Sequence, residues 1–218
     1  MSERFSERVD IVDSQGREVF KFDAAAAVLD LGAQGNEGDL RLRGDDGETK
    51  IRLDGGRSLI SIANAAGKQT LLLDGSAGDI VLENADCAEE FDCASSDVES
   101  GDVVVADDCG AVSRCMCSFD KRVVGIVSGA GSYRPGIVLH HCNGNSERVP
   151  VAIVGKAICK VDAIHGPVAV GDLLTTSPTP GHAMRASNPS MAFGAIVGKA
   201  LAPLTEGVGL VPVLVGLQ

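Results

Sequence analysis

Residues 49–82 read TKIRLDGGRSLISIANAAGKQTLLLDGSAGDIVL. In the runs ISI (60–62) and IVL (80–82), apolar residues occupy every second position, as they do in FKF (20–22) and LRL (40–42) earlier in the chain. This alternation is typical of a half-buried β-strand, because successive side chains of a strand point to opposite faces. The stretch therefore predicts short strands separated by turns.

The same pattern recurs every twenty residues between residues 9 and 82. Apolar residues align in three columns: Ile11, Leu31, Ile51 and Leu71; Phe20, Leu40, Ile60 and Ile80; Phe22, Leu42, Ile62 and Leu82. Turn-forming residues align between these columns: Gly16, Asn36, Gly56 and Ser76, and also Gly35, Gly55 and Gly75. Such residues supply positive φ angles or local side-chain hydrogen bonds. We therefore predict an all-β fold that starts with a two-strand unit repeated four times.

Three arrangements of this repeat remain open. One rung offers only about four or five inward apolar residues, a thin core for a single chain given the entropy of ordering each residue. Three chains wound together as an intertwined homotrimer would complete the core of a β-helical, solenoid-like shaft. A two-sided solenoid of one chain and a plain antiparallel meander are the alternatives. In each, the charged residues between the apolar columns are expected to face solvent and discourage aggregation of sheet edges: Arg41, Arg43, Lys50 and Arg52.

The register of the repeat stops after Asn84, which predicts a shaft over residues 1–84. The acidic, turn-rich segment 85–97 is interpreted as a junction. Residues 98–218 form a second β region with internal symmetry, since 100–130 resembles 170–200. In that alignment Gly101-Asp102 matches Gly171-Asp172, Gly125 matches Gly194, and Gly129 matches Gly198. We expect a compact two-lobed β-barrel or β-clip, and the internal symmetry suggests an old duplication.

Charge and composition argue against several classes of partner. The chain has 218 residues and a net charge of −11, and such a surface repels nucleic acid and anionic membranes. No stretch approaches the roughly 20 apolar residues of a membrane span. Residues 1–13 lack the basic and apolar regions of a Sec signal peptide. We therefore expect cytoplasmic synthesis and, where the protein is found outside a cell, release by lysis or a dedicated machine.

The second region resembles a known family. It contains VVGIVSGAGSYRPGIVL, RVPVAIVGKAICKVDA, GPVAVGDLLTTSPTPGHAMRA, FGAIVGKAL and GLVPVLVGLQ. These runs resemble the C-terminal β domain of phage tail-fibre and tail-appendage proteins, a group that includes the peptidase G2 (intramolecular chaperone autocleavage) domains. The resemblance covers about 85–218. It implies trimer assembly and, in some members, self-cleavage; no cleavage nucleophile can be matched residue by residue, so none is carried over.

The sequence offers two kinds of candidate site. Ser128, in GIVSGAG, is the best serine nucleophile, but this motif is not a G-x-S-x-G elbow, and a glycine-rich turn explains it equally well. Zinc is the other possibility, since five of the seven cysteines lie close together: Cys87, Cys93, Cys109, Cys115 and Cys117. Their C-x5-C and C-x-C spacings match structural zinc sites poorly. We expect buried or free thiols, with disulfides formed after release as the alternative, and no cofactor.

These observations favour a structural role over an enzymatic one. We expect a trimeric fibre or spike of a phage tail or phage-like particle, located in the virion or in an extracellular filament. Its expected partners are other copies of the chain and other tail or particle proteins. A cell-surface receptor is a further candidate, for which the loop at Tyr133, Arg134 and Pro135 is a candidate contact. The second region would drive trimerisation and set strand register. A self-cleaving assembly domain and a bacterial surface filament are the alternatives.

Overall fold

The computed structural model describes residues 8–23, 25–141 and 147–216. The chain divides into two compact units, Met1–Glu83 and Asn84–Gln218, which are treated separately below. Within the described residues almost all regular structure is strand, and the helix α1 (Pro189–Ala192) has four residues. None of the described helices is long and apolar enough to cross a membrane. The predicted all-β class is confirmed.

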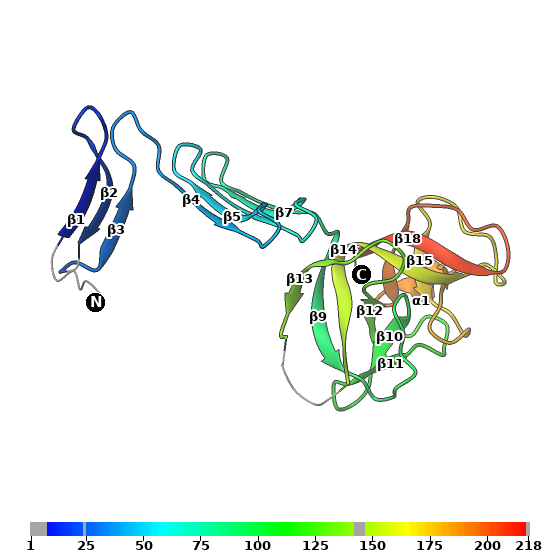
Figure 1. The fold of residues 1–218 in the computed structure, drawn as a ribbon. Coiled ribbons are helices and arrows are strands. Elements are labelled where there is room, and N and C mark those ends of the chain that lie inside the picture. Colours follow the sequence, from blue (N-terminus) through cyan, green and yellow to red (C-terminus); the bar gives the residue numbers. More distant parts are fainter. Residues whose placement is uncertain (1–7, 24, 142–146, 217–218) are drawn as a thin grey trace. The chain divides into compact units, whose positions relative to one another are not determined.

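The first unit contains two antiparallel sheets (Figure 1). One sheet consists of β1 (Arg8–Val12), β2 (Glu18–Asp23) and β3 (Val28–Leu31). The other consists of β4 (Asp39–Arg43), β5 (Thr49–Asp54), β6 (Leu59–Ala63), β7 (Gln69–Asp74) and β8 (Asp79–Leu82). Every strand pairs with its neighbours in sequence, so each sheet is a meander. Within the described part of this unit, one chain therefore does not coil into a solenoid.

Two kinds of turn alternate along the five-stranded sheet. Turns of five residues, such as 44–48 and 64–68, place a glycine in the left-handed region, Gly47 at φ 79° and Gly67 at φ 76°. Turns of four residues, such as 75–78, start after an aspartate whose carboxylate accepts backbone N–H groups; Asp74 Oδ1 accepts them from Ser76 and Ala77. These hydrogen bonds close the turn without help from a second chain.

The two sheets are out of phase with each other, which the sequence alignment does not show. The alignment places Gly16 and Gly56 in one column, but Gly16 lies in a five-residue turn and Gly56 in a four-residue turn. The connection 32–38 between β3 and β4 has seven residues, and Ala33 and Asn36 exchange two backbone hydrogen bonds of 2.8 Å in it. This additional small turn shifts the sequence by one strand, so β2 corresponds structurally to β5 and β7.

The second unit is built around a closed barrel. Its strands are β9 (Asp86–Asp92), β10 (Val103–Ala106), β11 (Val112–Arg114), β12 (Val123–Val127), β13 (Pro135–Leu139), β14 (Arg148–Asp162), β15 (Leu173–Thr176), β16 (Ala183–Arg185), β17 (Ile196–Ala200) and β18 (Val208–Gly216). The order β14-β16-β15-β17-β18 closes because β18 returns to pair with the second half of β14. The first half of β14 pairs with β12 on one side and with β9 on the other. Most of segment 85–97, interpreted above as a junction, is therefore β9 and its continuation within this unit.

The internal symmetry of this unit is visible in its hydrogen bonds. Gly101 donates from its backbone N–H to Val127, and Gly171 donates in the same way to Ala200, both at 2.8 Å. The carboxylates of Asp102 and Asp172 each accept a backbone N–H three residues upstream. The match of Gly101-Asp102 with Gly171-Asp172 is thus a true structural equivalence, shared by the β10–β12 and β15–β17 motifs.

The matches predicted for Gly125 and Gly129 are wrong. Val104 on β10 pairs with Gly125, and Leu174 on β15 pairs with Gly198, so Gly125 corresponds to Gly198. A Cβ atom at Gly125 would collide with the carbonyl oxygen of Ala152, and one at Gly198 would collide with that of Leu214. Glycine is required at both positions because the neighbouring strand approaches too closely for a side chain. The connection between β16 and β17, which contains α1, is longer than the one between β11 and β12. This difference in length displaced the sequence alignment of the two motifs.

Candidate functional site

One face of the five-stranded sheet in the first unit is entirely apolar. Cross-strand pairing arranges its ten side chains in two rows: Leu40, Leu53, Ile60, Leu73 and Ile80; Leu42, Ile51, Ile62, Leu71 and Leu82. We call these ten residues the apolar face. Six of the large side chains are between 37% and 50% exposed, and Ile80 is 71% exposed. Nothing in the described part of this unit covers these seven side chains completely.

The opposite face of this sheet is polar where β4 and β5 pair. Arg52 lies 2.8 Å from Asp39 and 2.7 Å from Asp54, and Arg41 lies 2.6 Å from Asp39. Hydrogen bonds from Arg41 and Arg52 lower the pKa of Asp39 below its usual range. These ion pairs make this part of the opposite face polar, although Asp39 Oδ1, Arg52 Nε and Asp54 Oδ2 have no hydrogen-bond partner. The apolar face carries no such charges.

An open groove marks one end of the apolar face. It has a volume of about 560 Å³, and Leu29 and Leu31 of β3 line it together with residues of the five-stranded sheet. Leu40, Leu53, Ile60 and Leu73 form its apolar wall. Asp54 and Ser58 also line the groove, but the Asp54 carboxylate is paired with Arg52. The walls are mainly apolar, so the groove is suited to apolar side chains.

Ser128 is buried in the second unit and is 3% exposed. Its hydroxyl donates a hydrogen bond of 2.8 Å to Asp86 Oδ2, and its backbone N–H donates to the carbonyl of Pro150. The hydroxyl thus faces a carboxylate of β9 that the sequence did not associate with it. The second oxygen of Asp86, Oδ1, has no hydrogen-bond partner.

Burial raises the pKa of Asp86, and the hydrogen bond from Ser128 only partly opposes this shift. A raised pKa means that the folded chain binds the proton more tightly than the unfolded chain. Stability contributed by the proton is therefore full below the unfolded value of 3.8 and is lost as the pH rises through the folded pKa. Above that window the folded state holds a poorly compensated buried carboxylate.

We predict that Asp86→Asn increases the free energy of unfolding relative to wild type above this window and not below it. Urea denaturation of both proteins at a series of pH values from about 3.5 to 8 measures the difference. Ser128→Ala removes the hydrogen bond that favours the carboxylate and so raises the pKa of Asp86 further. In this variant, stability should therefore be lost at a higher pH than in the wild-type protein. A difference between Asp86→Asn and wild type that does not change with pH would contradict the assignment.

The cysteines lie in different environments. Cys115 and Cys159 are buried, Cys87 and Cys93 are half-buried, and Cys109 and Cys117 are exposed; these six are free thiols, and Cys142 lies outside the described residues. Burial raises the pKa of the Cys115 thiol to about 12 and also raises that of Cys159, so both remain protonated. The described residues contain no group of three or more His, Cys, Asp or Glu side chains that could hold a metal ion.

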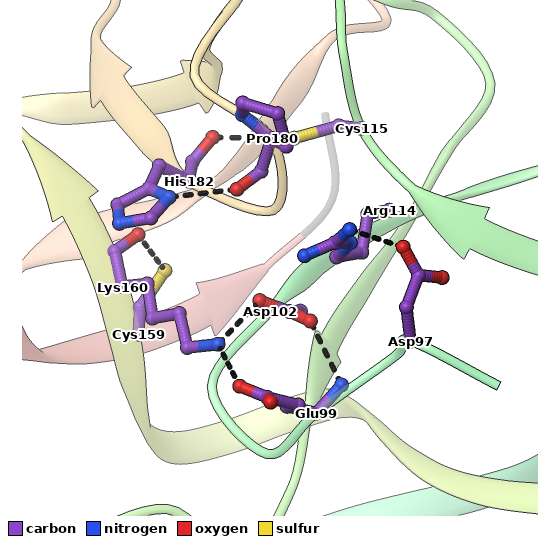
Figure 2. Close-up of polar contacts among 9 residues, drawn as sticks. All are labelled: Asp97, Glu99, Asp102, Arg114, Cys115, Cys159, Lys160, Pro180 and His182. Atoms are coloured by element: carbon purple, nitrogen blue, oxygen red, sulfur yellow. Dashed lines mark hydrogen bonds and ion pairs between the residues drawn. The ribbon is translucent and has the colours of Figure 1, made fainter.

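A charged cluster lies beside the two buried cysteines (Figure 2). Lys160 on β14 donates hydrogen bonds to Asp102, at 2.8 Å, and to Glu99, at 2.9 Å. Arg114 on β11 pairs with Asp97. These contacts connect the 97–102 segment to two strands of the barrel unit, and every charge drawn in Figure 2 has an opposite charge beside it. The cluster therefore holds the structure together and leaves no charge free to bind a ligand.

The other residues singled out in the sequence also make local contacts. The Arg134 guanidinium donates to the carbonyls of Gly129, Gly131 and Tyr133, and Lys156 Nζ lies 5.9 Å from the centre of the Tyr133 ring. His141 Nδ1 lies 2.6 Å from Glu90. The structure does not bring these residues together with Ser128 into a nucleophile–base–oxyanion arrangement.

Comparison with known proteins gives a structural neighbour of low similarity. No family model matches the sequence, and no curated protein matches it significantly. The crystal structure of the pre-mature bacteriophage phi29 gene product 12 aligns with 18% sequence identity and a TM-score of 0.42. The alignment covers 68% of this chain and 24% of that one, so the chain spans about a quarter of the neighbour's length. A TM-score of this size does not establish a common fold, so the function proposed below depends on the sheet faces and the sequence.

Two features of this site were not found from the sequence. The Ser128 hydroxyl bonds Asp86, which lies 42 residues away in the chain, beyond the reach of any local motif. The second feature is β18, whose sequence VGLVPVLVG is apolar at odd and even positions alike. A strand with apolar residues on both faces is expected to be covered on both sides. This pattern is the sequence signal from which the importance of β18 could have been inferred.

Proposed function

We propose that the chain is a structural protein of a phage tail or phage-like particle, in which three copies pack their apolar faces around a common axis. The observation that carries this proposal is the uncovered row of apolar pairs on β4–β8. Burying a Leu or Ile side chain completely contributes about 1.5–3 kcal/mol, so covering ten half-exposed ones contributes on the order of 10 kcal/mol per chain. A single meander leaves this surface in water unless another sheet covers it.

Simple geometry favours three sheets. A strand of five residues at about 3.4 Å per residue is about 17 Å long, and three such sheets enclose an axis that lies about 5 Å from each sheet. This is half of the roughly 10 Å that separates packed sheets, so apolar side chains from three sheets fill the interior. Four sheets would lie about 8.5 Å from the axis and leave a hollow core. The chains in this arrangement lie side by side, because each strand pairs within its own chain, and they need not be intertwined.

The barrel unit would set the relative height of the three chains. Neighbouring chains with repeated strands can slip past each other by one repeat at little cost, because each pair of strands presents apolar side chains similar to those of the next pair. A folded unit without that repeat, joined to the end of the sheet, removes this freedom. The assignment to a phage particle is supported by the resemblance of residues 85–218 to tail-fibre and tail-appendage domains. Other particle proteins and a cell-surface receptor remain proposed partners.

We predict a mass three times that of the 22.4 kDa chain when the full-length protein is examined by sedimentation equilibrium. Two sheets face to face would also satisfy the 10 Å spacing, and a dimer mass would therefore contradict the three-sheet arrangement while retaining the apolar interface. A monomer at about 100 μM would contradict the proposal itself, since an interface of this size should hold at that concentration.

Self-cleavage is less well supported. The candidate nucleophile Ser128 is buried, its hydroxyl is bonded to Asp86, and its backbone N–H is bonded to Pro150 and does not point to an open oxyanion position. A filament of a bacterial surface would use the same apolar face, so only an image of the assembled particle separates it from a phage fibre.

A further inference from the structure

The barrel unit has an exposed apolar surface of its own on β18. Val211, Val213 and Val215 of this strand point into the barrel core, and the alternate positions point outward. Leu210 is 57% exposed and Leu214 is 46% exposed. Pro212 lies between them, opposite Ile158 on β14, and its carbonyl accepts the N–H of Leu201. We call Leu210, Pro212, Leu214, Ile158 and Leu201 the β18 patch.

Lysines flank this patch on both sides. Leu214 pairs with Lys156 on β14 and with Lys199 on β17, and all three side chains point outward and are exposed. Neither lysine forms an ion pair within the described residues, although Lys160 on the same face of β14 pairs with two acids. A shallow groove of about 380 Å³ adjoins the patch where Gly171, Gly198 and Gly216 provide no side chains. The surface therefore suits a partner that is apolar at its centre and acidic at its rim.

The same chain presents such a surface elsewhere. Ile137 and Leu139 on the edge strand β13 are each 45% exposed. Glu89 on β9 lies directly opposite Leu139, on the same side of the sheet, and forms no ion pair within the described residues. We call Ile137, Leu139 and Glu89 the β13 edge. It is distinct from the β18 patch, because β9 pairs with the first half of β14 and β18 pairs with the second half.

We propose that the β18 patch of one copy binds the β13 edge of the next copy, so that the barrel units form a head-to-tail ring. Two different surfaces on one chain make a heterologous contact, and such contacts close into rings when the rotation allows it. The flanking lysines argue against three β18 patches facing one axis, because lysines of adjacent copies would then repel each other. This inference rests on the proposed self-association and specifies which surfaces of the barrel unit take part.

Charge reversal in the full-length protein tests the contact. Lys156→Glu/Lys199→Glu and, separately, Glu89→Lys should each raise the concentration at which the oligomer dissociates by about tenfold or more. Lys156→Glu/Lys199→Glu combined with Glu89→Lys should restore much of the loss, because each chain then carries the reversed charge on both surfaces. Lys121→Glu changes an exposed lysine outside the patch and serves as the matched control. Sedimentation velocity over a dilution series measures all five proteins.

The outcomes separate this inference from the proposed function. If the reversals leave dissociation unchanged while a charge in the apolar face dissociates the oligomer, the β18 contact is wrong and the sheet interface stands. If the single reversals weaken association and the combined variant does not recover, the β13 edge is not the partner surface. A wild-type chain that is monomeric at about 100 μM overturns both. The altered lysines are exposed and Glu89 is half-buried, so thermal unfolding should change little in each variant, and a large change would reveal a folding defect.

Discussion

Ile62→Glu should convert the oligomer to a monomer without unfolding the sheet. Ile62 lies in the middle of the apolar face, between Ile51 and Leu71, and is 39% exposed in the single chain. A glutamate there can reach water in the monomer, whereas three of them at a common axis would be buried close together. Desolvation and mutual repulsion of such carboxylates cost several kcal/mol each, comparable to the whole gain from packing the apolar faces. Sedimentation equilibrium measures the mass, and circular dichroism checks the strands.

Ser61→Glu is the matched control for this variant. Ser61 is the preceding residue on β6 and points to the opposite face, where it pairs with Arg52 and Leu72. The same charge on the same strand should therefore leave the mass unchanged. An oligomer that survives Ile62→Glu, or that is lost equally in both variants, would show that the apolar face is not the interface.

Lys160→Met should lower the free energy of unfolding by about 3–5 kcal/mol, the range expected when a buried ion pair loses one partner. The Asp102 carboxylate, with a side chain 1% exposed, accepts hydrogen bonds from Lys160 Nζ and from the Glu99 backbone N–H. Methionine retains much of the apolar stem and removes the charge, so Asp102 remains buried with no cation. Urea or thermal denaturation measures the loss.

Glu99→Gln removes the other acid that pairs with Lys160 and provides the comparison. The Glu99 side chain is 72% exposed, and exposed ion pairs contribute only about 0–1 kcal/mol. The free energies of unfolding of the two variants should therefore differ by at least about 2 kcal/mol. Equal losses would mean that the burial of Asp102 does not determine the energetics of the cluster.

Much of the first unit was predictable because its information is local. The alternation in FKF, LRL, ISI and IVL places strands where β2, β4, β6 and β8 are found. The phase shift at 32–38 was not predictable in the same way, because apolar columns twenty residues apart look alike whichever way the strands pair. Only the turn lengths distinguish the two phases, and they depend on hydrogen bonds such as those between Ala33 and Asn36.

The second unit was less predictable because its contacts are distant in sequence. The Gly101 and Gly171 turns were matched correctly since both carry the same local Gly-Asp motif. Gly198 was matched to the wrong glycine, because its role is to admit the neighbouring β18 backbone, which no local pattern reveals. The pairing of Ser128 with Asp86 and the exposure of β18 also depend on how the barrel closes.

The seven-residue connection between the two small sheets has a mechanical consequence. Hydrogen-bonded ladders run from β1 to β3 and from β4 to β8, but no ladder joins β3 to β4. In a fibre built from this chain, tension along the axis would pass at 32–38 through the covalent chain and the few hydrogen bonds of its small turn, with no strand ladder beside them. That glycine-rich segment would stretch before either ladder broke. The fibre would thus have a built-in elastic joint, which absorbs load while the five-stranded sheet keeps its register.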